Sequence, residues 1–189
     1  AGYAGDIAEA GRHLLGLVED LSDLETVEDA AFNPSPDQID LADCARRAAG
    51  ILGVRAQERS ITIVTPQTDE RAPAIGEFRR VLQILLNVIG NAIRYTPGNT
   101  TVSIDVGGDD QWAWLAVTDE GIGISVEHAG KVFEKFERLG RSGDGGSGLG
   151  LYISRKLARA MGGDLIVQPA DSGGACFILS LPADHSGQS

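Results

Sequence analysis

Residues 145–151 read Gly-Gly-Ser-Gly-Leu-Gly-Leu and lead directly into a helical pattern. Glycine lets backbone N–H groups approach a ligand without obstruction by a side chain. A helix N-terminus adds unpaired donors and the positive end of a dipole, which suits an anion such as phosphate. This stretch therefore predicts an anion site, and the remaining question is which other residues face it.

A second stretch, residues 76–95, predicts an amphipathic helix with an unusual polar face. At about 100° per residue, its apolar side chains gather on one side. The other side carries Gln83, Asn87, Asn91, Arg94 and Tyr95. An Asn carbonyl is a neutral oxygen ligand for Mg²⁺, which takes further ligands from waters and phosphates, and an Arg adds charge-assisted bonds to the same anion. The Asn pair alone fits ordinary surface polarity, but together with the glycine stretch it indicates a ligand site.

A third stretch, residues 119–124, reads Asp-Glu-Gly-Ile-Gly-Ile and follows a predicted strand. Asp119 could be a turn residue that accepts backbone hydrogen bonds. Alternatively, its carboxylate could accept a bond from an exocyclic amine such as that of adenine. Ile124, Met161 and residues 149–151 would then wall an apolar pocket.

Periodicity places these stretches on an α/β two-layer sandwich, in which three helices cover a mixed, mainly antiparallel sheet. Helices are predicted at residues 41–57, 76–95 and 149–161, strands at 61–64, 101–106, 112–118, 164–168 and 175–181, and a short helix at 126–136 within a glycine-rich, charged loop. In the helix at 41–57, Leu41, Cys44, Ala48, Ile51 and Leu52 are predicted to point inward.

A long helix at residues 4–29 precedes this unit. Its apolar positions, Ile7, Ala10, Leu14, Leu17, Leu21 and Leu24, follow alternating steps of three and four. Docking on its own domain is one interpretation, but a seam this regular favours a partner helix in a coiled-coil-like arrangement. Asn-Pro-Ser-Pro at residues 33–36 ends the helix and marks a boundary. We therefore predict a helical segment over 1–32, a catalytic domain over 37–182 and a flexible tail over 183–189.

The composition narrows the function further. The net charge of −11 argues against a nucleic-acid partner. Cys44 and Cys176 have no metal or disulfide spacing and predict buried thiols in a cytoplasmic protein. No run is long and apolar enough to span a bilayer, and no signal peptide precedes the first helix. The chain begins without Met in an apparent helix, so we expect a piece of a longer protein whose full-length form could be membrane-anchored.

Two common nucleotide motifs do not fit the glycine stretch. Leu149 follows Gly148 where the motif GxxxxGK[ST] needs Lys, which excludes a Walker-type phosphate loop. The pattern also misses GxGxxG, and a charged loop rather than a strand precedes it.

Four motifs, taken in order, resemble those of the GHKL superfamily of ATP-binding domains, and most closely those of the sensor histidine kinases. Residues 87–97 (Asn-Val-Ile-Gly-Asn-Ala-Ile-Arg-Tyr-Thr-Pro) resemble the N box, 119–124 the first glycine box, 133–138 (Phe-Glu-Lys-Phe-Glu-Arg) the F box, and 146–151 the second glycine box. Four motifs in order are far more specific than any one. The resemblance implies a Bergerat-type ATP-binding fold, and residues 13–25 resemble the end of the second helix of the family's dimerisation and phosphotransfer domain.

The resemblance also implies a role for each matching residue. Asn87 would ligate Mg²⁺, and Asn91 and Arg94 would contact the phosphates of ATP. Tyr95 would border the nucleotide, and Asp119 would hydrogen-bond the adenine amine. Phe133 and Phe136 would anchor a mobile lid over residues 125–145, and Arg138 would reach the outer phosphate. The remaining implied contacts are Gly121, Gly123, Ile124, Gly146, Ser147, Gly148, Leu149, Gly150 and Leu151.

Some positions depart from the family pattern without removing a binding group. Arg94 stands where Lys is usual, Glu120 where Asn is frequent, and Ser147 where Thr is common. Gly90 lies inside a predicted helix, where it costs roughly 1 kcal/mol relative to Ala.

Three functions are compatible with the resemblance: a histidine kinase catalytic domain, a hydrolysing ATPase, and a nucleotide-binding module without phosphotransfer. Gln83 stands one turn before Asn87, where the hydrolysing relatives place a general-base Glu, and an amide cannot take that proton. The kinase is therefore favoured. His13 lacks the family's flanking acidic residue and Pro, so we interpret it as a helix-surface residue. The phosphoacceptor histidine would lie on helices outside this chain, which alone would bind MgATP without autophosphorylating. Expected partners are those helices, a second copy in a homodimer and a response regulator.

Overall fold

A computed structural model describes residues 2–137 and 147–187. Its main sheet has the strand order β2-β4-β5-β7-β6, and only the β2–β4 pair is parallel. The five strands are β2 (Thr62–Val64), β4 (Thr101–Gly108), β5 (Trp112–Thr118), β6 (Asp164–Pro169) and β7 (Ala175–Pro182). This arrangement confirms the predicted mixed, mainly antiparallel sheet.

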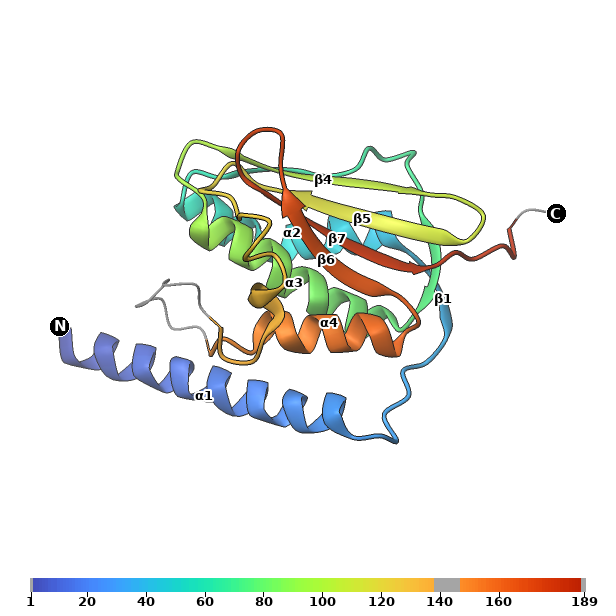
Figure 1. Cartoon of the computed structure of the whole chain (residues 1–189). Helices are drawn as coiled ribbons and strands as arrows, with labels where there is room; N and C mark the ends of the chain where they lie inside the picture. Colours follow the sequence, from blue (N-terminus) through green and yellow to red (C-terminus); the bar gives the residue numbers. More distant parts are fainter. Residues whose placement is uncertain (1, 138–146, 188–189) are drawn as a thin grey trace.

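Three helices cover one face of this sheet, and together they form the predicted two-layer sandwich (Figure 1). They are α2 (Leu41–Glu58), α3 (Phe78–Tyr95) and α4 (Gly150–Ala160). Strand alternation sends Val102, Ile104 and Leu115 into the core, where they meet apolar side chains of α3 such as Ile89. The prediction that Ile51 points inward is wrong, because this side chain is 59% exposed. It lies beside the buried stripe of α2 rather than on it.

A second, two-stranded sheet was not predicted. It pairs β1 (Asp37–Asp40) with β3 (Pro73–Gly76) in antiparallel fashion. β1 reads Asp-Gln-Ile-Asp and β3 begins with Pro, so neither shows an alternating apolar pattern that would predict a strand. Asp40 joins β1 to α2, because its carboxylate accepts hydrogen bonds from the backbone of Ala42 (3.1 Å) and Ala72 (2.8 Å). The predicted start of α3 at residue 76 accordingly moves to Phe78.

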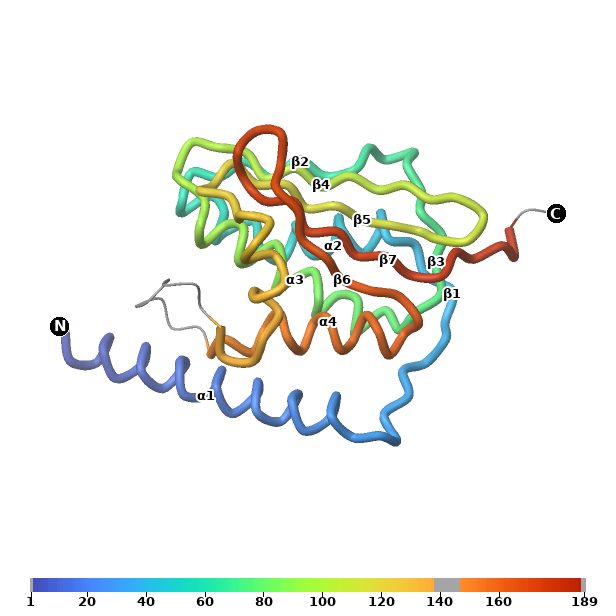
Figure 2. Tube along the Cα trace, viewed as in Figure 1, coloured from blue at the N-terminus to red at the C-terminus, as the bar shows by residue number. Residues whose placement is uncertain are grey.

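Helix α1 (Gly2–Glu28) runs along the side of the helical layer that is remote from the sheet (Figures 1 and 2). Its second half docks on its own domain, where Leu24 and Val27 pack against the core. Ile7, Leu14 and Leu21 of the same seam stay between 54% and 69% exposed. The apolar seam therefore docks on its own domain at the C-terminal end of α1, and the partner helix stays a prediction for the exposed seam positions Ile7, Leu14 and Leu21.

The segment after the first glycine box contains less helix than expected. In place of a helix over residues 126–136, it has turns over 126–130 and one 3₁₀ turn, η1 (Lys131–Phe133). The turn ends because Glu134 adopts an extended backbone, with φ −73° and ψ 150°.

Within the described part of the chain, no helix combines the length and the apolar character needed to cross a membrane.

Candidate functional site

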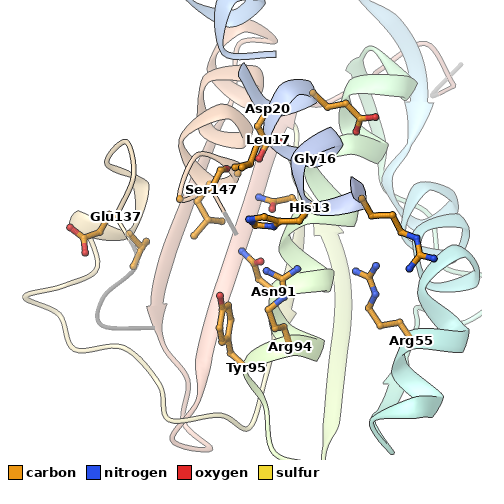
Figure 3. A pocket seen from close by; sticks show the side chains of 17 residues that line it. His13, Gly16, Leu17, Asp20, Arg55, Asn91, Arg94, Tyr95, Glu137 and Ser147 are labelled. Atoms are coloured by element: carbon orange, nitrogen blue, oxygen red, sulfur yellow. The ribbon is translucent and has the colours of Figure 1, made fainter. Parts of the chain in front are cut away.

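The polar face of α3 borders a cavity of about 440 Å³ (Figure 3). The predicted residues that line it are Asn87, Asn91, Arg94, Tyr95, Ser147, Gly148, Gly150 and Leu151. The structure therefore brings the helix and the glycine stretch together, although they lie some fifty residues apart in the sequence. This size lies within the usual range for small-molecule sites.

Asn87 is held in a defined orientation inside this cavity. Its Nδ2 donates a hydrogen bond to Oγ of Ser154 on α4 (3.0 Å), and Ser154 is buried. The carbonyl Oδ1 is thereby turned away from Ser154 and is available to a ligand. Oδ1 lies against the backbone of Gly150, where an added Cβ would overlap it. Gly150 is thus required for the close approach of α4 to the Asn87 side chain.

The second glycine box forms the opposite wall. Gly148 adopts a positive φ of 75°, and its carbonyl accepts a hydrogen bond from the backbone of Phe136 (2.8 Å). Oγ of Ser147 accepts the N–H of Leu149 (3.1 Å) at the start of α4. Leu149 itself is only 1% exposed and packs in the core. Leu149 lines neither of the two cavities described in this subsection, and its contact with the nucleotide stays a prediction.

A smaller cavity of about 40 Å³ adjoins the first and contains the first glycine box. Asp119, Gly121, Gly123 and Ile124 line it, together with Asn91 and Tyr95. Oδ1 of Asp119 accepts backbone hydrogen bonds from Gly121 (2.9 Å) and Ala175 (3.1 Å). Oδ2 has no hydrogen-bond partner among residues 2–137 and 147–187. Both interpretations of Asp119 are therefore compatible: one oxygen holds the turn, and the other is available to a ligand.

The walls of this smaller cavity differ in part from the prediction. Ile124 and Leu151 line it as expected, joined by Ala92, Val132 and Phe177. Met161 does not, because its sulfur lies at the far end of α4, where it accepts the N–H of Glu77 (3.4 Å). Glu120 points away from the cavity as well, and its carboxylate accepts the N–H of Thr101 (2.9 Å).

The two phenylalanines of the F box have different environments. Phe133 is buried, packs edge-on against Phe177 with ring centroids 6.2 Å apart, and lies under the guanidinium of Arg155. The side chain of Phe136, by contrast, is 62% exposed, and its expected role as a second anchor of the lid stays a prediction. Phe136 is tied by its backbone to Gly148 instead, with a positive φ of 64°. Arg138 and Gly146, both predicted phosphate contacts, lie outside the described residues.

Sequence reasoning missed the contribution of α1 to this site. Arg12, His13, Gly16, Leu17, Glu19 and Asp20 line the larger cavity. His13, interpreted from the sequence as a helix-surface residue, projects from α1 toward Asn91 (Figure 3). The carboxylate of Asp20 accepts a hydrogen bond from Ser147 (2.5 Å). The prediction for α1 rested on the spacing of its apolar residues, whereas polar positions of the helix make most of these contacts.

Two further acidic residues fasten α1 to the domain. Asp23 accepts a hydrogen bond from Nε2 of Gln83 (2.9 Å). Glu28 pairs with the ammonium of Lys135 and accepts the hydroxyl of Tyr152 (2.9 Å). The Lys135 ammonium, together with this hydroxyl, lowers the pKa of Glu28, so the carboxylate stays charged at neutral pH. The contacts of α1 therefore reach α3, the F box and α4.

The sequence of this chain is similar to that of known ATP-binding proteins. The family model described as "Histidine kinase-, DNA gyrase B-, and HSP90-like ATPase" matches residues 76–185, more than half of the chain. The "Non-motile and phage-resistance protein" of Caulobacter vibrioides is 33% identical over 99% of this chain and 23% of its own length. A sensor-like histidine kinase of Rhizobium meliloti is 28% identical over 98% of this chain and 36% of its own length. The chain thus spans well under half of each relative.

Solved structures agree with these sequence matches. The crystal structure of full-length ShkA in complex with AMPPNP has a TM-score of 0.81 and 30% identity, covering 96% of this chain and 38% of that one. The mycobacterial sensor histidine kinase MprB has a TM-score of 0.66 and 27% identity, covering 78% and 97%. The chain belongs to the family of histidine kinase-, DNA gyrase B- and HSP90-like ATPases, and it carries the ATP-binding domain of the sensor histidine kinase type.

Proposed function

We propose that this chain binds MgATP and donates the γ-phosphoryl group to a histidine on a dimerisation domain whose phosphoacceptor helices lie outside it. The observation that carries the proposal is the orientation of Asn87. Nδ2 is committed to Ser154, which leaves Oδ1 for a ligand in the cavity that Asn87 lines, and Gly150 has no side chain that would displace this oxygen. A neutral amide oxygen next to a phosphate-binding loop suits an ion that takes most of its ligands from phosphates and water.

The donor set fits magnesium better than a metal held by the protein alone. In the part of the chain that the structure describes, no group of three or more His, Cys, Asp or Glu side chains could hold a metal ion. Asn87 would therefore be the protein's ligand, and the nucleotide would supply most of the others. Bound Mg²⁺ would neutralise charge on the β- and γ-phosphates.

The residues of this chain would bind and orient ATP rather than form bonds with it. Oδ2 of Asp119 would accept the adenine amine, while Asn91 and Arg94 would contact the phosphates from α3. Gly148 and Gly150 would let backbone N–H groups approach the same phosphates. An imidazole nitrogen of the acceptor histidine would attack the γ-phosphorus in line, and ADP would leave. Positioning and charge stabilisation are the main protein contributions to phosphoryl transfer of this kind.

Gln83 supports the kinase over a hydrolysing ATPase. Its Nε2 donates to Asp23, and its Oε1 accepts from Arg80 (3.2 Å). Both ends of the amide are therefore engaged by protein groups, and Gln83 is not among the residues that line the cavity. With no general base at this position, slow hydrolysis would preserve the γ-phosphoryl group for the acceptor.

The partners follow from the same proposal. The exposed apolar positions in the first half of α1 would pack against the remaining helices of the dimerisation domain, in a homodimer. A response regulator would then receive the phosphoryl group. We place this catalytic domain in the cytoplasm, where ATP is available, whether or not the full-length protein is anchored in a membrane.

Calorimetry with MgATP and ADP tests nucleotide binding, and no signal with either would refute the proposal. Asn87→Ala should remove the Mg²⁺-dependent part of ATP affinity, which is measured with and without a chelator. Labelled ATP should give phosphohistidine only when the chain is extended through the upstream helix. Label in neither protein would favour a binding module, and rapid phosphate release by this chain alone would favour an ATPase.

A further inference from the structure

Basic side chains from three helices line the larger cavity. Arg12 and His13 come from α1, Arg55 from α2 and Arg94 from α3, and all four line the cavity. Figure 3 shows Arg55 reaching in from α2 and Arg94 from α3, with His13 above Asn91. The resemblance to the kinase family assigned a role only to Arg94.

Within the described residues, these arginines have no ion pair with a carboxylate, although the protein is strongly acidic. The chain has 27 Asp and Glu residues against 16 Lys and Arg, so an arginine should readily find a carboxylate. Other arginines do so: Arg47 pairs with Asp43, Arg80 with Glu77, and Arg155 and Arg159 with Asp164. Over residues 2–137 and 147–187, no ion pair joins Arg12, Arg55 or Arg94 to any carboxylate.

Carboxylates line the same cavity. Asp20 is hydrogen-bonded to Ser147, and Figure 3 shows Glu137 on the opposite side of the cavity from Arg55. The guanidinium of Arg94 lies 5.9 Å from the ring centroid of Tyr95, which neutralises no charge. Unneutralised cations around a cavity repel one another and gain from an anion placed between them.

The guanidinium of Arg55, which comes from a neighbouring helix, lies beside Gly90 of α3. Gly90 is buried within α3, and a Cβ added there would lie 3.9 Å from Nη1 of Arg55. The Arg55 side chain therefore passes over α3 at the one residue that has no side chain. Glycine within a helix is otherwise unfavourable, and a long side chain at this position would meet the guanidinium.

We propose that Arg55, assisted by Arg12 and His13 of α1, forms an outer phosphate subsite beside Arg94 that binds the terminal phosphate of a nucleoside triphosphate. The inference rests on the proposed function, because the nucleotide must occupy this cavity. It assigns Arg55 a role in distinguishing ATP from ADP. It also makes the docked position of α1 part of the triphosphate site.

The test compares the affinities of ATP and ADP, each with Mg²⁺, for the whole chain and for Arg55→Ala, by calorimetry at low salt. Loss of a charge-assisted bond should weaken ATP binding about tenfold and leave ADP binding unchanged. Arg47→Ala is the matched control, because it removes the same charge from an exposed position of the same helix. Arg12→Ala should weaken the binding of ATP but not that of ADP, as Arg55→Ala does. Thermal melting should show that the variants are folded, since Arg55 is exposed.

Equal effects of Arg55→Ala on ATP and ADP, or no effect on either, would overturn the subsite. Inorganic phosphate separates the two sources of the anion. Arg55→Ala could weaken the binding of free phosphate and leave the ratio of ATP to ADP affinity unchanged. In that case the arginines would bind free phosphate only, and the inference would fail. The proposed function fails separately, if the unsubstituted chain binds neither nucleotide.

Discussion

Asp119 carries two roles on two oxygens, so two substitutions at one position should separate them. Oδ1 accepts the N–H groups of Gly121 and Ala175, which join the end of β5 to the start of β7. Asp119 lines the smaller cavity, where we propose that Oδ2 accepts the adenine amine. Asp119→Asn keeps an acceptor oxygen for the two N–H groups, which fixes the new NH₂ toward the base. Asp119→Ala removes both functions.

The magnitudes follow from these contacts. In Asp119→Asn, a charged acceptor is lost and two donors face each other, which should cost about 2–3 kcal/mol, or roughly 30- to 150-fold in the Kd of ADP. Its free energy of unfolding should stay within about 1 kcal/mol of the parent, since both backbone bonds remain. Asp119→Ala leaves two partly buried N–H donors without an acceptor and should lose about 2–4 kcal/mol of stability.

Calorimetry with ADP and urea unfolding measure these two effects separately. Inosine diphosphate, which carries a 6-oxo group, provides a further control because the new amide can donate to it. Asp119→Asn should therefore lower the preference for ADP over inosine diphosphate. Binding of ADP to Asp119→Asn at parental affinity would refute the assignment of the base. Parental stability of Asp119→Ala would refute the role of Oδ1.

Three further predictions concern other positions. Gly150→Ala should displace Oδ1 of Asn87 and weaken Mg²⁺-dependent ATP binding about tenfold, with little effect on metal-free binding, as calorimetry with and without a chelator would show. Gly90→Ala should raise the free energy of unfolding by roughly 1 kcal/mol in urea titrations, because its Cβ has room and a helix-interior glycine is unfavourable. Burial raises the pKa of the Cys44 thiol to about 12, so a thiol reagent near neutral pH should label only the partly exposed Cys176 in the folded protein, and labelling of both would contradict the burial.

The elements that bury an apolar stripe could be predicted from the sequence. The stripes of α3 and α4, and the alternation of β4 and β5, determine which face points inward, and the structure has these elements close to the predicted bounds. β1 and β3 could not be found in this way, because they are held mainly by backbone pairing and by the carboxylate of Asp40. Backbone pairing leaves little signal in side-chain type.

The site residues that lie within the four sequence motifs could be predicted, whereas those outside the motifs could not. The sequence predicted that the polar face of α3 and the second glycine box form one site, because both suit the same anion. Arg55 could not be predicted, since nothing in the sequence of α2 indicates that its side chain crosses another helix. The unexplained Gly90 was the available signal, but a missing side chain does not say which neighbour uses the space.

Helix α1 contributes both a carboxylate and a guanidinium to the lining of the larger cavity, so its docking should affect the affinity for phosphate. Asp20 accepts a hydrogen bond from Ser147 of the second glycine box, whereas Arg12 adds a cation to the lining of the cavity. A bound phosphate would repel the carboxylate of Asp20 and attract the guanidinium of Arg12. If docking of α1 changes the affinity for the nucleotide, the nucleotide must change the docking of α1 by the same free energy. Asp20→Asn should therefore raise ATP affinity in calorimetry, while Asp6→Asn, on an exposed turn of α1 outside the cavity wall, should not. Equal responses of the two variants would mean that only the net charge of α1 matters, and that Asp20 does not compete with phosphate at Ser147.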